Sequence, residues 1–269
     1  MRITKREILF SIIIVFLMAS IGMLIHSVIQ ESITKDSEKI FMAAKIEEPD
    51  MFNYSLQTSI GNALVYGTIT AAEPVSVPEI RGEYFSITKV TERYTKHIET
   101  ETYTDSSGKR KTREVVKYSW DYYDSDEYYS ESFYFMGNKF NNRIDGLPEE
   151  KVYNLEEVVS DEWKSDVHDG YIYKDGYLFK NVGDKREYYI VTNMEMDGTL
   201  EVNLVDNSIK NFYGGENIKF HYNKSIEEVV DEAKNRGTIS TIVFVSIWSI
   251  LTFAAVIGFY YIDNRWLEG

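Results

Sequence analysis

The chain has 269 residues, and its 43 acidic side chains outnumber the 29 Lys and Arg side chains, which gives a formal net charge of −14. This acidic excess argues against a nucleic-acid-binding protein, because phosphate recognition depends on cationic side chains. The sequence contains no cysteine, which excludes disulfide bonds, thiolate catalysis and cysteine-ligated metals.

The first predicted element is an apolar helix over residues 8–29, which contains no formally charged side chain. At 1.5 Å per residue its twenty-two residues span about 30 Å, the thickness of the hydrocarbon core of a bilayer. A second uncharged block, residues 239–262, ends in Tyr260 and Tyr261, as aromatic side chains do at a membrane interface. Two transmembrane helices are therefore predicted.

The first apolar block has an alternative interpretation as a cleaved signal peptide. Its apolar run is longer than the usual 7–15 residues of such peptides, and no clear A-x-A cleavage site follows it. We therefore expect an uncleaved helix.

The membrane topology follows from the basic residues Arg2, Lys5 and Arg6, which precede the first helix. Positive charges favour the cytoplasmic side, so we expect the N-terminus there, and the second helix returns the C-terminus to that side. The prediction is a two-pass protein of the cell membrane, with the bilayer itself as one partner. Its parts are a cytoplasmic segment 1–7, helix 8–29, an extracytoplasmic domain 30–238, helix 239–262 and a cytoplasmic segment 263–269.

The middle of the chain is predicted to form an α+β domain that is mainly β. Residues 31–45 contain helix formers and should prolong the first helix outward until Glu48-Pro49-Asp50 ends it. Capping-box patterns predict short helices opening at Asn154 and Ser225. Alternating or β-branched runs predict strands over residues 63–71, 75–80, 188–192, 199–205 and 217–222, in addition to a long hairpin over 83–123.

The hairpin turns at Asp105-Ser106-Ser107-Gly108. Near this turn both faces are expected to be polar, with Thr95, His97, Glu99 and Glu101 on one face and Lys96, Thr100 and Thr102 on the other. A two-stranded ribbon is marginally stable alone, so it either projects into solvent or pairs with a subunit or partner. The candidate contact residues are Tyr94, His97, Tyr118, Tyr122 and Tyr123. Trp120 is considered with them but is assigned to the core of the domain.

Catalytic and metal-binding signals are weak. Asp121, Asp124, Asp126 and Glu127 suggest calcium, but the D-x-D-x-D-G loop is missing, so a solvated acidic strand is preferred. His168 is flanked by Asp166 and Asp169 but needs a further partner to act as a base or ligand. No nucleotide-binding, serine-hydrolase or zinc-protease motif is present. We expect no catalytic residue, no cofactor and no metal.

Several segments resemble the transmembrane protein 43 (LUMA) family in their order and spacing. They are Asn62–Pro74, the hairpin region Tyr94–Trp120, Val182-Gly183-Asp184-Lys185-Arg186, and Ser225–Val229 before the second membrane helix. Family members usually carry several membrane helices after this domain, whereas this sequence contains one. The resemblance implies a membrane scaffold that acts through protein partners and gives no active-site residue. The bias towards Ile, Lys, Asn and Tyr suggests a bacterial or phage origin.

The expected function is therefore that of an integral membrane scaffold or interaction protein, not an enzyme. It would act by association of its extracytoplasmic domain with a second copy or with a membrane protein partner. The first alternative is a phage or prophage envelope protein that alters the host surface, for example by excluding a second phage. The second is an envelope enzyme acting through Asp166, His168 and Asp169.

Overall fold

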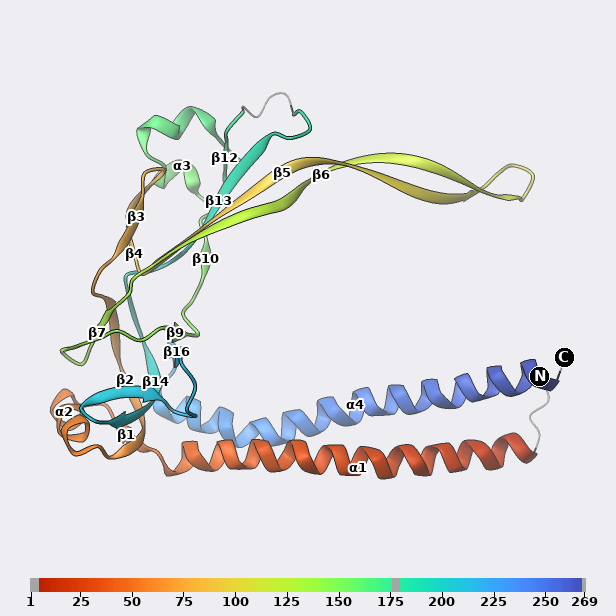
Figure 1. The fold of residues 1–269 in the computed structure, drawn as a ribbon, viewed down its shortest axis with the longest axis horizontal. Helices are drawn as coiled ribbons and strands as arrows, with labels where there is room; N and C mark the ends of the chain where they lie inside the picture. The colour runs from red at the N-terminus through yellow and green to blue at the C-terminus, as the bar shows by residue number, and fades with distance from the viewer. Residues whose placement is uncertain (1–4, 176–179, 268–269) are drawn as a thin grey trace. The chain divides into compact units, whose positions relative to one another are not determined.

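The computed structural model describes residues 5–175 and 180–267, without the side chains of Lys5 and of residues 264–267. Arg2 and the side chain of Lys5, used above to predict the topology, lie outside this description. The chain divides into two compact units, one made of the terminal helices with residues 61–64 and the other of residues 46–60 and 65–224. The predicted α+β class is confirmed, with two long apolar helices and a mixed sheet (Figure 1).

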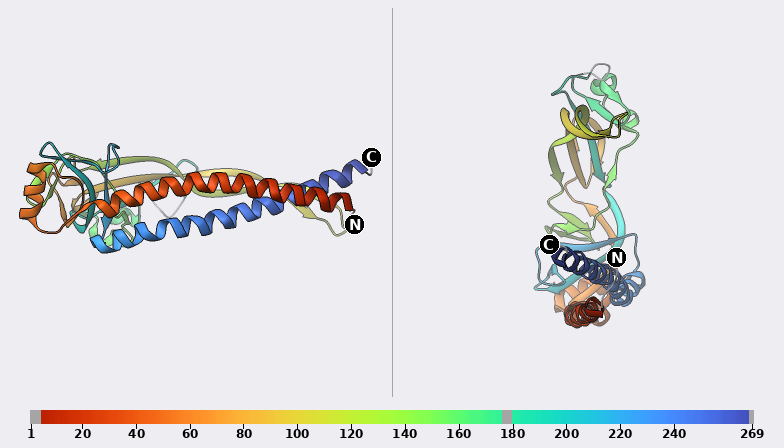
Figure 2. Two further views of the ribbon diagram at one scale, coloured as in Figure 1. Left: turned by 90° about the horizontal axis from the view of Figure 1, so that it is seen from below. Right: turned by 90° about the vertical axis from the view of Figure 1, so that its right-hand side faces the viewer.

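The two terminal helices, α1 (Lys5–Met42) and α4 (Ile226–Leu267), are each long and apolar enough to cross a membrane. They lie side by side in both views (Figures 1 and 2). The Trp248 indole donates a 2.9 Å hydrogen bond to the carbonyl of Met18 and lies against Gly22, where a Cβ atom would come within 2.4 Å of Trp248 Nε1. The absence of a side chain at Gly22 therefore allows close packing.

Polar side chains between α1 and α4 form contacts from one helix to the other. His26 Nε2 lies 3.1 Å from Thr241 Oγ1, and Arg6 pairs with Asp263 at 2.7 Å. Further along, Gln30 donates to the carbonyl of Gly237. These contacts join defined positions of the two helices and favour one way of pairing them.

The expectation that Glu48-Pro49-Asp50 ends the first helix is wrong, because a separate helix, α2 (Pro49–Thr58), begins there. The helix α1 already ends at Met42, and Pro49 begins α2. Proline suits the first turn of a helix because its missing N–H would have no partner there. Phe52 and Leu56 are the large apolar side chains that α2 buries.

The larger sheet has eight strands, among the described residues, in the order β8-β7-β2-β14-β16-β9, with β1 beside β2 and β15 beside β14. β9 runs parallel to β16, so the sheet is mixed. Leu64, Leu200 and Val202 are fully buried in its strands. The strands are β1 (Ala44–Ile46), β2 (Gly61–Ala71), β7 (Phe133–Phe135), β8 (Asn138–Phe140), β9 (Ile144–Asp145), β14 (Glu195–Val205), β15 (Ser208–Asn211) and β16 (Ile218–Tyr222).

The second sheet has six strands among the described residues, in the order β11-β12-β13-β5-β6 with β10 beside β13. Ile87, Ile172 and Tyr189 are fully buried on one of its faces, together with Leu155 and Val159. The strands are β5 (Ser86–Thr104), β6 (Arg110–Tyr129), β10 (Glu150–Lys151), β11 (Val167–His168), β12 (Tyr171–Tyr173) and β13 (Lys185–Thr192). Shorter elements are β3 (Val75–Val77) and β4 (Ile80–Tyr84), which pair with each other, α3 (Leu155–Val158) and the 3-10 turn η1 (Asp161–Asp166).

Candidate functional site

The long hairpin is formed by β5 and β6, which pair from Ser86 and Tyr129 to Thr104 and Arg110. It therefore extends beyond the predicted limit of residue 123. β13 pairs with β5 only as far as Arg93, so the remainder of the hairpin is a two-stranded ribbon (Figure 1). We call the three-stranded part the base and the ribbon from Thr95 to Ser119 the tip.

The turn of the hairpin is held by Asp105. Its carboxylate accepts hydrogen bonds from the backbone N–H groups of Ser107 and Lys109 and pairs with Lys111 at 2.9 Å. The hydrogen bonds from Ser107, with that ion pair, hold the pKa of Asp105 well below its ordinary value. Gly108 adopts a φ of 82°, which this turn requires and which L side chains rarely adopt.

One face of the tip carries a row of ion pairs, which we call the charged face. Glu99 pairs with Lys117 at 2.5 Å and Glu101 with Arg113 at 3.2 Å. The expectation that Glu99 and Glu101 lie on one polar face of the hairpin is confirmed.

The opposite face of the tip is not uniformly polar, which corrects the expectation of two polar faces. Ile98 lies directly opposite Val116, two residues from Tyr118 along β6. These three side chains are 61%, 46% and 50% exposed, respectively. Tyr118 was predicted as a contact residue, but Ile98 and Val116 were not, because only the polar members of the alternation entered the expectation of two polar faces. We call Ile98, Val116 and Tyr118 the apolar row.

The structure brings two of the predicted contact residues together on the face that carries the apolar row. The ring of Tyr94 stacks on that of Tyr118, with centroids 5.7 Å apart and planes at 14°, and tilts against Trp120. Tyr122 pairs with Glu92, which places it on this face as well, and it is 67% exposed. Trp120 is only partly buried, so it does not simply fill the core.

The other two predicted contact residues lie elsewhere on the hairpin. His97 is on the charged face, with Nε2 2.7 Å from a carboxylate oxygen of Asp121. Tyr123 is the extra residue of a β-bulge, and Arg93 and Lys185 lie over its ring.

An aromatic and cationic stack that the sequence did not reveal continues from Trp120 into the base. The guanidinium of Arg186 lies 4.6 Å from the centroid of Trp120 and 3.7 Å from that of Tyr171, and its Nε pairs with Glu92 at 2.7 Å. Such cation–π contacts favour a fixed arrangement of the rings. The only sequence signal was the alternation in β13, and no pattern showed which strand would lie beside it.

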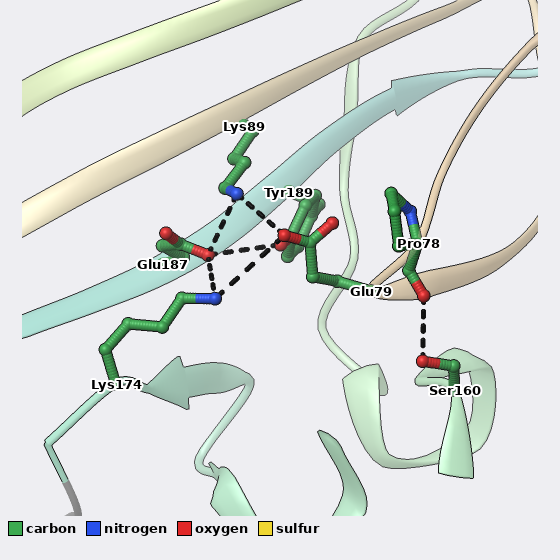
Figure 3. Close-up of polar contacts among 7 residues, drawn as sticks. All are labelled: Pro78, Glu79, Lys89, Ser160, Lys174, Glu187 and Tyr189. Atoms are coloured by element: carbon green, nitrogen blue, oxygen red, sulfur yellow. Dashed lines mark hydrogen bonds and ion pairs between the residues drawn. The ribbon is translucent and has the colours of Figure 1, made fainter. Parts of the chain in front are cut away.

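A buried group of charges lies on the other face of the base, and we call it the charge cluster (Figure 3). Lys89 pairs with Glu79 at 2.7 Å and with Glu187 at 3.4 Å, while Lys174 lies 3.0 Å from Glu187. The hydroxyl of Tyr189 donates to Glu187 at 3.3 Å. Two carboxylates and two ammonium groups thus balance one another and connect β5 with β13 and with Glu79 before β4.

The pKa shifts of Glu79 and Lys89 show that the charge cluster favours their charged forms. Burial opposes ionisation of Glu79, but the hydrogen bond from Lys89 and neighbouring positive charges hold its pKa below the ordinary value. Burial likewise opposes the charge of Lys89, but Glu79 and Glu187 outweigh it and raise the pKa. Burial raises the pKa of the Tyr189 hydroxyl. A general acid–base pair needs the opposite, a carboxyl raised or a lysine lowered towards neutrality.

Two further groups of residues could carry chemistry, one around His168 and one along β6. His168 lies in β11, half exposed, with Nε2 3.3 Å from Asp169. Asp121, Asp124, Asp126 and Glu127 all lie along β6, where Glu127 pairs with Arg143. Among the described residues, no group of three His, Asp or Glu side chains could hold a metal ion.

Comparisons with protein families, with curated proteins and with solved structures find no match to this chain. The candidate site is therefore defined by its own geometry: an exposed apolar row on a projecting ribbon whose base is fixed by the charge cluster and the aromatic stack.

Proposed function

We propose that this protein is an integral membrane scaffold that acts by protein–protein association of its β-rich domain. In this proposal α1 and α4 cross the cell membrane, both termini are cytoplasmic and residues 30–238 lie outside. The length and apolar character of the two helices support the membrane location. The resemblance to the transmembrane protein 43 (LUMA) family is consistent with a scaffold and remains part of the proposal.

The observation that carries this proposal is the apolar row beside an open strand edge. Ile98 and Val116 are β-branched side chains that face solvent although the same domain buries many others. Exposed edges and adjacent apolar side chains are the features by which strands recruit further strands. The hairpin is therefore the proposed contact element, with Tyr94 and Tyr118 as aromatic anchors.

The proposal that the chain is not an enzyme is supported by the charge cluster. The pKa of Glu79 is held below its ordinary value and that of Lys89 above it, by their ion pairs, so both shifts favour the charged forms of these two groups. The cluster then serves to hold the hairpin base to its neighbours.

Cross-linking of intact cells tests the proposal with two shortened hairpins. One variant replaces Lys96–Tyr118 by Asn-Gly and removes the apolar row, while the control replaces only Thr104–Arg110 and keeps the apolar row with Lys111, Arg113 and Lys117. Both junctions preserve the native register, at the pairs Thr95 with Ser119 and Tyr103 with Lys111. Asn-Gly favours the two-residue turn that each junction needs.

The expected result is that the tagged full-length protein and the control give the same cross-linked bands, and that the longer deletion loses them. Equal amounts of each variant in the membrane fraction show that insertion is unaffected. Bands that survive the longer deletion would overturn the proposed role of the hairpin.

A further inference from the structure

The outer edge of β6 is the longest open strand edge in the described part of the chain. The strand covers 20 residues and lies at the end of its sheet, with β5 on one side and no described strand on the other. Except at Ser125, whose backbone N–H donates to the Asp124 carboxylate, the backbone groups on that side of the strand can pair with another strand.

The charges along β6 are separated by sign. Its first half carries four basic side chains, Arg110, Lys111, Arg113 and Lys117, against one acidic side chain, Glu114. Its second half carries four acidic side chains and no basic one, at Asp121, Asp124, Asp126 and Glu127. If these charges served only to prevent association, charges of a single sign would be more effective, because they repel a second copy in any orientation.

Antiparallel pairing of two β6 strands would place opposite charges together. The order of residues is reversed in the second strand, so the basic half of each copy lies beside the acidic half of the other. Parallel pairing would instead bring like charges together. A two-fold axis through the pair also satisfies the symmetry of a closed dimer, in which both copies use the same surface.

The same arrangement places the two apolar rows on one side of the joined sheet. Side chains directly opposite each other in paired strands point to the same face. Val116 and Tyr118 lie close to the middle of β6, so those of one copy approach those of the other. Exposed apolar surface is then covered at the centre, with charge pairs on either side.

We infer that the hairpin's partner is a second copy of this chain, joined by antiparallel pairing of the two β6 edges into a continuous four-stranded ribbon. This inference rests on the proposed function and specifies its partner. The open edge of β5 in the tip is less suitable because it is shorter: β13 covers β5 as far as Arg93, and only the part of the strand beyond that residue is open.

Charge reversal in the full-length protein tests this inference. One variant carries Arg110→Glu, Lys111→Glu and Arg113→Glu, and the other carries Asp124→Lys, Asp126→Lys and Glu127→Lys. Each variant alone has like charges at both ends of the dimer, so co-purification of two differently tagged copies in detergent should fall on the order of tenfold. Co-expressed, the two variants have opposite charges at both ends, and co-purification should return to the level of the unmodified protein.

Failure of the mixed pair to co-purify, or undiminished self-association of either single variant, would overturn the β6 pairing. The rescue also controls for folding, because a misfolded variant could not be restored by its counterpart. If the shortened hairpin still loses cross-links to a different protein while the charge variants fail to rescue each other, the proposed function stands and only the identity of the partner is wrong. Cross-links that survive the deletion would contradict both.

Discussion

The two ends of β5 lie in contrasting environments. At the base, β5 is paired with β13 on one side and β6 on the other, and Ile87 is fully buried. At the tip, only β6 remains, and Ile98 is 61% exposed. The same type of side chain, isoleucine, therefore lies in the core at one end of β5 and at the surface at the other.

This contrast predicts which residues stabilise the fold and which take part in association. Removing apolar surface from water at the base stabilises the fold, whereas the same side chain at the tip contributes little until something covers it. Substitutions at the base should therefore unfold the domain, and substitutions at the tip should change what it associates with.

The largest difference is expected between Ile87→Ala and Ile98→Ala. The first leaves a cavity in a packed core and should lower the free energy of unfolding by about 2–5 kcal/mol. The second should change it by less than about 0.5 kcal/mol, because the side chain is already in contact with water. Chemical unfolding of the full-length protein in detergent measures both, and equal losses would contradict the contrast.

A smaller but still large loss is expected when Lys89 is replaced by Met. Glu79 and Glu187 then face each other with only Lys174 to balance them, and breaking a buried pair in this way costs about 3 kcal/mol. Lys117→Met is the matched control, because Lys117 pairs with Glu99 on an exposed surface. The same unfolding experiment should show no measurable change for the control, and a harmless Lys89→Met would mean that the charge cluster does not hold the base.

The charge cluster also predicts a dependence of stability on pH. The folded pKa of Glu79 lies below its ordinary value of 4.5, so its contribution is complete above about pH 5 and is lost as the pH falls through the folded value. The folded pKa of Lys89 lies above 10.5, so its contribution is complete below that value and is lost only as the pH rises through the folded pKa.

Thermal unfolding between pH 3 and 7 checks the acidic limit. The unfolding temperature should fall below about pH 5, and Glu79→Gln should show a smaller fall because the titrating group is absent. Identical pH curves for the two proteins would show that Glu79 does not contribute.

Elements that depend on neighbouring residues in the sequence were predicted from local patterns. The uncharged blocks lie in the helices α1 and α4, and the turn at Asp105–Gly108 closes the hairpin as expected. Pro49 was assigned to the end of a helix because proline breaks helices in their interior, but it also begins them. The sequence alone could not distinguish these two roles without knowing where α1 ends.

The charge cluster and the aromatic stack could not be predicted in the same way. Glu79, Lys89 and Glu187 come from separate parts of the chain and meet only because β13 pairs with β5 in a particular register. Arg186 reaches Trp120 for the same reason. Ile98 and Val116, by contrast, are visible in the alternation of the hairpin, where only their neighbour Tyr118 was predicted as a contact residue.

The most direct test of the proposed role of the hairpin compares Val116→Lys with Val115→Lys. Both neighbours are valines on the same strand, but Val116 belongs to the apolar row, whereas Val115 lies opposite Glu99 on the charged face. In co-purification of two tagged full-length copies, Val116→Lys should reduce association on the order of tenfold, while Val115→Lys should leave it unchanged. Equal association for both variants would contradict the account.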